Sequence, residues 1–80
     1  MEHIRMIWDF RGPNAEQTAA HHAKHLKEFT DREHIQHFGF GHQQEIGAHY
    51  TAYVIIDKQD MITLRDSLKP ARAIYEEIHG

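Results

Sequence analysis

The chain has 80 residues, no cysteine and a formal charge of −3, and these properties exclude several kinds of protein. Its length suits a single domain over residues 1–80, and without cysteine it has neither a disulfide nor a Cys-based zinc site. Nine basic residues against twelve acidic ones provide no basic surface for nucleic acid. Residues 1–10 lack the pattern of a signal peptide and no apolar stretch has the length of a membrane span. We therefore expect a cytoplasmic protein with neither a nucleic-acid nor a membrane partner.

Histidine is the residue type whose share departs most from ordinary composition. Nine residues are histidine, and protonating all of them would move the formal charge from −3 to +6. Because the ordinary pKa of histidine is about 6.5, this change falls just below neutral pH. Solubility and self-association are then expected to depend on pH, unless the histidines are simply abundant surface residues.

The first two predicted elements are a strand and a helix. In His3–Phe10 one face is wholly apolar and the other mixed, with a period of two, which predicts a strand whose apolar face lies against helices. Asn14 is a suitable N-cap for a helix over Ala15–Arg32, expected to bury Trp8. The helix carries an apolar stripe at helical spacing, consisting of Ala15, Ala19, Ala23, Leu26 and Phe29.

The rest of the chain predicts two more strands and two more helices. Residues 35–46 favour a strand in which Gly39 and Gly41 indicate a bulge or a close backbone contact. His49–Asp57 alternates with a period of two and predicts a further strand. A helix is expected from there to residue 69, where Pro70 interrupts it. Pro70 suits the start of a final short helix, with an apolar stripe of Ala71, Ile74 and Ile78.

This order of elements predicts an α+β fold of the ferredoxin-like kind, β-α-β-β-α(-α), with both helices on one face of an antiparallel sheet. In this prediction the fourth strand is missing or replaced by the tail. The second sheet face then has no helix to cover it and meets either solvent or another subunit. We therefore expect a homodimer, which would also reinforce a domain this small.

The uncovered face is the first candidate site. Its mixed character suits a dimer interface that encloses a small-molecule cavity, or alternatively a polar-rimmed dimer contact without chemistry. The two predicted strands place these residues on it: Arg5, Ile7, Asp9, His49, Thr51, Tyr53 and Ile55. Asp9, His49 and Tyr53 are the catalytic candidates, because a histidine beside an aspartate or tyrosine can act as a general acid or base. Arg5, Ile7, Thr51 and Ile55 are the ligand-binding candidates.

The second candidate site is a group of histidines on the predicted helix. His21 and His25 are four residues apart, and His22 and His25 are three apart, so their imidazoles lie on neighbouring turns. Such imidazoles can share a divalent transition metal such as zinc or nickel. The alternative is that His22 is a hydrogen-bonded histidine at the edge of the core while the other two are solvated.

One segment resembles a known family. His25-Leu26-Lys27-Glu28-Phe29 is similar to a helix motif of the YciI-like proteins, a family of the dimeric α/β-barrel superfamily, in which His-Leu is followed by an aromatic residue. His21-His22-Ala23-Lys24 stands where that family usually has Arg-Pro. The resemblance implies a His–Asp pair in a cleft between sheet and helix, with His25 as the histidine and Asp9 as the aspartate.

Overall fold

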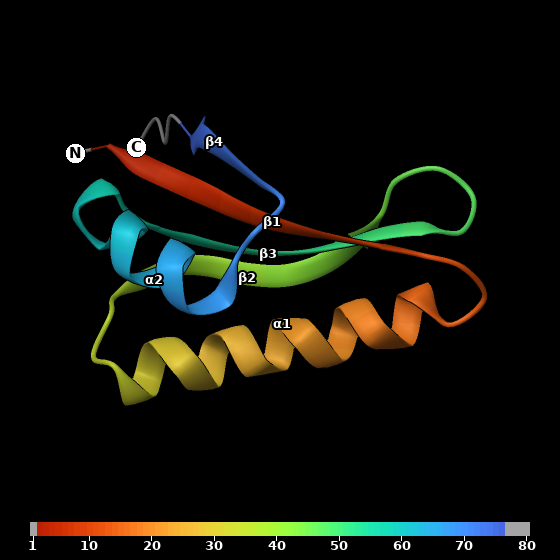
Figure 1. The fold of residues 1–80 in the computed structure, drawn as a ribbon, viewed down its shortest axis with the longest axis horizontal. Helices are drawn as coiled ribbons and strands as arrows, with labels where there is room; N and C mark the ends of the chain where they lie inside the picture. Colours follow the sequence, from red (N-terminus) through yellow and green to blue (C-terminus); the bar gives the residue numbers. More distant parts are fainter. Residues whose placement is uncertain (1, 77–80) are drawn as a thin grey trace.

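Four strands and two α-helices are formed by residues 2–76, the part of the chain that the computed structural model describes. Figure 1 shows the helices on the same side of the sheet. In chain order the elements are β1 (His3–Arg11), α1 (Ala15–Arg32), β2 (His37–Gln44), β3 (His49–Asp57), a single 3₁₀ turn (Lys58–Asp60), α2 (Met61–Leu68) and β4 (Arg72–Glu76). The expected α+β architecture, with an antiparallel sheet and helices on one face, is confirmed.

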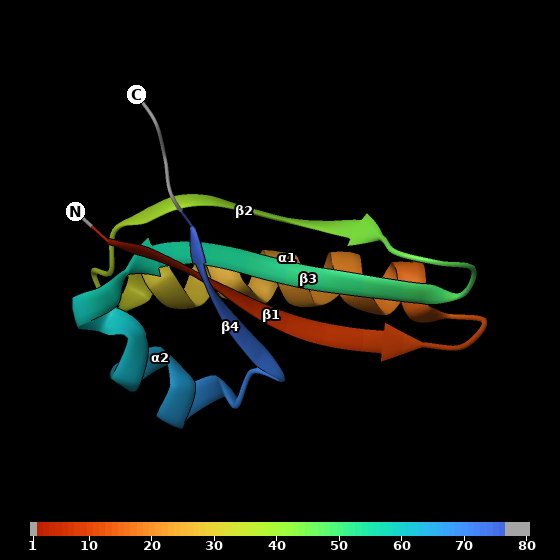
Figure 2. The same cartoon turned by 90° about the horizontal axis from the view of Figure 1, so that it is seen from above.

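The strands lie in the order β2-β3-β1-β4, and every neighbouring pair is antiparallel. β1 and β3 form the centre and pair along their whole length, from His3 opposite Asp57 to Arg11 opposite His49. β2 and β4 are the edge strands (Figure 2). The pairing of β2 is irregular between His37 and Gly39, which confirms the bulge predicted there.

The core lies between the sheet and the two helices. Period two directs Ile4, Met6 and Trp8 of β1 toward the helices, where all three are buried. The whole apolar stripe of α1 is buried against them, as its spacing predicts. The core also includes Ile35, Ala52, Val54, Ile56 and Leu64.

Trp8 links the central sheet to the end of α2. Its side chain is 7% exposed, in agreement with the predicted burial. The indole Nε1–H donates a hydrogen bond of 2.8 Å to the carbonyl oxygen of Leu68, in the last turn of α2. Because the last carbonyls of a helix have no partner within it, this bond supplies one.

The predicted final helix is wrong, because residues 72–76 form β4 instead. The free edge of β1 offers unpaired backbone groups, and β4 satisfies them by antiparallel pairing from Arg72 opposite Ile7 to Glu76 opposite His3. Pro70 therefore ends α2 without starting another helix. Ile78, the last residue of the predicted stripe, lies outside the described residues.

Candidate functional site

The sheet face without helices, called the open face below, differs from the expectation in one respect. Ile7, Thr51 and Ile55 are already buried in the single chain, with exposed fractions of 6%, 2% and 8%. They lie on the neighbouring strands β1 and β3, where Arg5 stands opposite Ile55 and Tyr53 opposite Ile7. The side chains of the open face therefore partly shield it from solvent. Some of its apolar atoms are buried without a partner subunit.

Asp9 is the centre of a polar cluster on the open face. Its Oδ1 accepts a hydrogen bond of 2.8 Å from His49 Nε2 and a second of 2.8 Å from Arg72 Nη2. The Asp9 side chain is 18% exposed and that of His49 21%, whereas Arg72 is 49% exposed. We call these three residues the Asp9 cluster. The proximity of Asp9 and His49 confirms a contact that the strand assignments allowed.

The electrostatics of the Asp9 cluster favour an ionised carboxylate. Burial alone would raise the pKa of Asp9, but the hydrogen bond from His49 and the charges of Arg72, His49 and Arg11 outweigh it and lower the pKa below its ordinary value. An ionised Asp9 only accepts, so His49 carries hydrogen on Nε2. The other ring nitrogen, Nδ1, is then an acceptor in the neutral ring and a donor in the charged one.

A second carboxylate lies close to this cluster. Glu45 Oε1 accepts hydrogen bonds from Gln43 Nε2 at 2.9 Å and from the Thr51 hydroxyl at 3.0 Å. These two bonds, together with the charges of His49 and Arg72, lower the pKa of Glu45. Thr51, a predicted ligand-binding residue, is thus already engaged within the chain.

Tyr53 and Arg5 form a separate pair on the same face. The Arg5 guanidinium lies 4.5 Å from the centre of the Tyr53 ring, a cation–π contact. The Tyr53 phenol extends over Gly41, where an added Cβ would lie 3.1 Å from the Tyr53 hydroxyl oxygen. This is the close backbone contact that Gly41 indicated. Of the three catalytic candidates on the open face, Asp9 and His49 thus contact each other, whereas Tyr53 contacts Arg5 and β2.

The structure divides the three helical histidines into a pair and a single residue. His21 Nε2 and His25 Nε2 are 2.9 Å apart on the exposed side of α1. His22 is turned toward the sheet, with its ring 5.0 Å from that of Trp8 and 5.4 Å from that of Phe10. Among residues 2–76 no group of three or more histidine and carboxylate side chains has the geometry to hold a metal ion.

The environment of His22 is unfavourable for a charge. Burial, followed by the nearby His25 and His21, lowers its pKa, and its buried Nε2 has no hydrogen-bond partner within the described chain. His22 is therefore a core-edge histidine, as the alternative interpretation held, but its Nε2 lacks the hydrogen bond expected there.

The His–Asp pair implied by the family resemblance is not formed. His25 lies on the solvent side of α1, where it contacts His21 and Glu28. Asp9 lies on the opposite side of the sheet and contacts His49 and Arg72. The sheet separates the two residues because Asp9 alternates with Trp8, the residue that faces α1.

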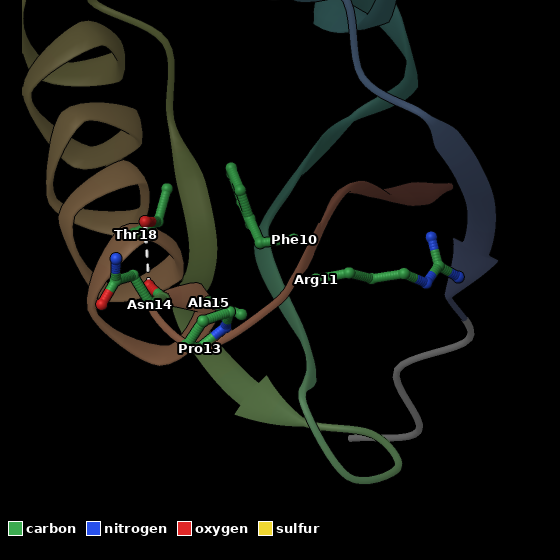
Figure 3. Close-up of a pocket in the computed structure, with 6 residues that line it drawn as sticks. All are labelled: Phe10, Arg11, Pro13, Asn14, Ala15 and Thr18. Carbon is green, nitrogen blue, oxygen red and sulfur yellow. Dashed lines mark hydrogen bonds between the residues drawn. The ribbon is translucent and has the colours of Figure 1, made fainter.

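A shallow pocket of about 200 Å³ lies where β1 leads into α1 (Figure 3). It is lined by Phe10, Arg11, Pro13, Asn14, Ala15 and Thr18, none of which is a predicted site residue. Figure 3 shows the Arg11 side chain extending away from the other five. Asn14 stands at the N-cap position without a side-chain bond to the helix, and its carbonyl oxygen instead accepts a bond of 2.9 Å from the Thr18 hydroxyl.

Sequence reasoning missed three members of the open-face clusters: Arg72, Glu45 and Gln43. The pattern after Pro70 predicts a helix at Arg72, although the alternation of Arg72 with Ile74 is also the spacing of a strand. Gln43 lies near the end of β2 and Glu45 directly after that strand. No periodic pattern there predicts which way a side chain points.

Comparison with known proteins gives no match: no family model, curated protein or solved structure shows significant similarity to the chain. Within residues 2–76 no helix is both long and apolar enough to cross a membrane.

Proposed function

We propose that this chain is a ferredoxin-like protein that acts as a homodimer and binds a small molecule against its open face. The succession β-α-β-β-α-β supports the fold assignment. The observation that carries the proposed function is the Asp9 cluster: a carboxylate, an imidazole and a guanidinium converge on a face that no helix covers. Such convergent polar groups beside apolar side chains are typical of small-molecule sites.

The chemistry of the Asp9 cluster favours a ligand that accepts hydrogen bonds. Asp9 already receives two hydrogen bonds on Oδ1, and Glu45 receives two on Oε1. Arg72 has five N–H donors, of which one bonds Asp9, and its side chain is 49% exposed. A small molecule with carboxylate or carbonyl oxygens matches these donors.

A second copy of the chain is the proposed cover. Ile74 of β4 stands opposite Arg5 on the open face and is 47% exposed, so this face keeps an apolar group that a partner can bury. An 80-residue chain also gains more from association than a larger one, since it buries a smaller share of its surface alone.

Sedimentation tests the dimer. At micromolar concentration the wild type is expected to sediment as a dimer, and Ile74→Glu as a folded monomer, because the new charge would be buried in the interface. Ile62→Glu is the matched control: Ile62 is 57% exposed on α2, on the other side of the molecule, and its variant is expected to remain dimeric. A monomeric wild type, or two variants that behave alike, would contradict the proposed interface.

Native mass spectrometry tests the ligand. The purified wild type is expected to retain a small molecule, seen as excess mass, and Arg72→Gln to lose it while keeping its fold by circular dichroism. Protein whose mass equals that of the chains alone, in repeated preparations, would contradict the binding function but not the dimer.

The contact between His49 and Asp9 favours a second candidate, an enzyme in which His49 transfers a proton. An imidazole oriented by a carboxylate is a common general base. In that case His49→Asn retains the bound molecule unchanged, whereas the wild type converts it to a species of different mass or isomeric form. Identical molecules recovered from both proteins would favour binding alone.

A further inference from the structure

The exposed histidine pair of α1 carries an inference that is independent of the open face. His21 and His25 stand one helical turn apart, and their Nε2 atoms approach to 2.9 Å. Their rings meet at 80° with centres 4.4 Å apart, so one ring presents its Nε2 hydrogen to the lone pair of the other. Both Nε2 atoms therefore already lie within one small region at the helix surface.

We propose that His21 and His25 form a two-imidazole site for a divalent metal of tetragonal or octahedral preference, namely Cu(II) or Ni(II). The site differs from the expected three-histidine site for zinc or nickel, because His22 is packed against Trp8 and Phe10. The chain supplies two adjacent ligands, and water completes the coordination.

The separation of the two nitrogens matches a metal whose neighbouring ligands stand at right angles. With metal–nitrogen bonds of about 2.0–2.1 Å, nitrogens 2.9 Å apart subtend an angle of about 90° at the metal. That is the angle between neighbouring ligands in square-planar and octahedral complexes, the geometries favoured by Cu(II) and Ni(II). Tetrahedral zinc needs about 3.3–3.4 Å between the nitrogens at the same bond lengths, which requires the rings to move apart.

A neighbouring carboxylate supports the ligand role of His25. Glu28 Oε2 lies 3.6 Å from His25 Nδ1, one turn further along α1. A carboxylate on this side favours hydrogen on Nδ1 and leaves the Nε2 lone pair for a metal, the arrangement in which ligating histidines are usually held. His21 Nε2–H is then the donor to His25. Metal binding requires His21 to move its proton to Nδ1 and both rings to tilt until the two Nε2 lone pairs meet at the metal.

Isothermal titration of CuCl₂, NiCl₂ and ZnCl₂ into the full chain tests the site. A short Gly-Ser extension at the N-terminus prevents the terminal amine from binding the metal together with His3. We expect one metal per chain in the tightest step and affinity in the order Cu(II), Ni(II), Zn(II). The Cu(II) electron paramagnetic resonance spectrum is expected to show two equatorial nitrogens.

Variants distinguish the pair from the other histidines. His21→Ala and His25→Ala are each expected to lose the tightest step, and Glu28→Gln to weaken it by up to about tenfold. His42→Ala removes an exposed histidine on β2 and is expected to leave the step unchanged. Retention of the tight step in His21→Ala, strongest binding by zinc, or one metal shared by two chains would each overturn the proposal. Because both sites of substitution are exposed, loss of folding does not obscure the result.

Discussion

The two faces of the sheet reach burial by different routes. On the helix-covered face, Met6 lies in the core between the sheet and the helices and has no exposed surface. On the open face its neighbour Ile7 is 6% exposed and stands opposite Tyr53, whose ring is paired with Arg5. The two residues are therefore almost equally buried but differently packed. Helices cover Met6, whereas side chains that can rearrange cover Ile7.

The largest expected effect on stability comes from replacing Met6 and Ile7, one at a time, by alanine. Met6→Ala is expected to lower the free energy of unfolding by about 3 kcal/mol, because the enclosed core cannot collapse onto the cavity. Ile7→Ala is expected to cost about half as much, since the flexible side chains around it can close in. Urea unfolding of both variants measures the difference, and equal losses would show that the open face is as rigidly packed as the core.

The second effect concerns the Asp9 cluster on the open face, which no helix covers. Asp9→Asn is expected to lower the free energy of unfolding by about 1 kcal/mol at pH 7, a figure reduced by the exposure of Arg72. Because the folded-state pKa of Asp9 is lowered, the stability that its charge contributes is present above its ordinary pKa and is lost as the pH falls through the folded value. The stability curves of the two proteins should therefore converge at strongly acidic pH, and curves that stay parallel there would exclude this origin.

The smallest effect at neutral pH belongs to His22, on the covered face. Its folded-state pKa is lowered, so the unfolded chain binds more protons between that value and the ordinary pKa of about 6.5. Stability is expected to fall as the pH drops below 6.5, by at most about 1.4 kcal/mol per pH unit from this group. From pH 7.5 to 5.5 the melting temperature of His22→Gln should fall less steeply than that of the wild type, and equal slopes would exclude His22 as the origin.

The sequence predicted the parts of the fold that depend on periodicity within one element. The alternation of Ile4, Met6 and Trp8 and the alanine-lined stripe of α1 identified the core, and alternation in β1 and β3 placed Asp9 and His49 on the same face. β4 could not be identified in this way. Its five residues are too few to show a period clearly, and the free edge of β1 that stabilises it is a tertiary feature. Arg72 was missed for that reason.

The candidate sites show the same limit at the level of side chains. Helical spacing placed His21, His22 and His25 on neighbouring turns but did not determine which ring faces the sheet. That choice depends on Trp8 and Phe10, which β1 brings to the helix from a different part of the chain. The family resemblance failed for Asp9 and His25 on similar grounds, because it could not show that the sheet lies between them.

Trp8 is the sole tryptophan of the chain, and its surroundings make it an optical reporter. The indole shares the junction of sheet, α1 and α2 with the ring of His22, 5.0 Å away, and its N–H is fixed on the Leu68 carbonyl. A protonated imidazole in such contact quenches indole fluorescence, whereas a neutral one quenches it far less. The emission intensity of the unlabelled protein should thus follow the charge on His22, and the emission wavelength should follow the docking of α2.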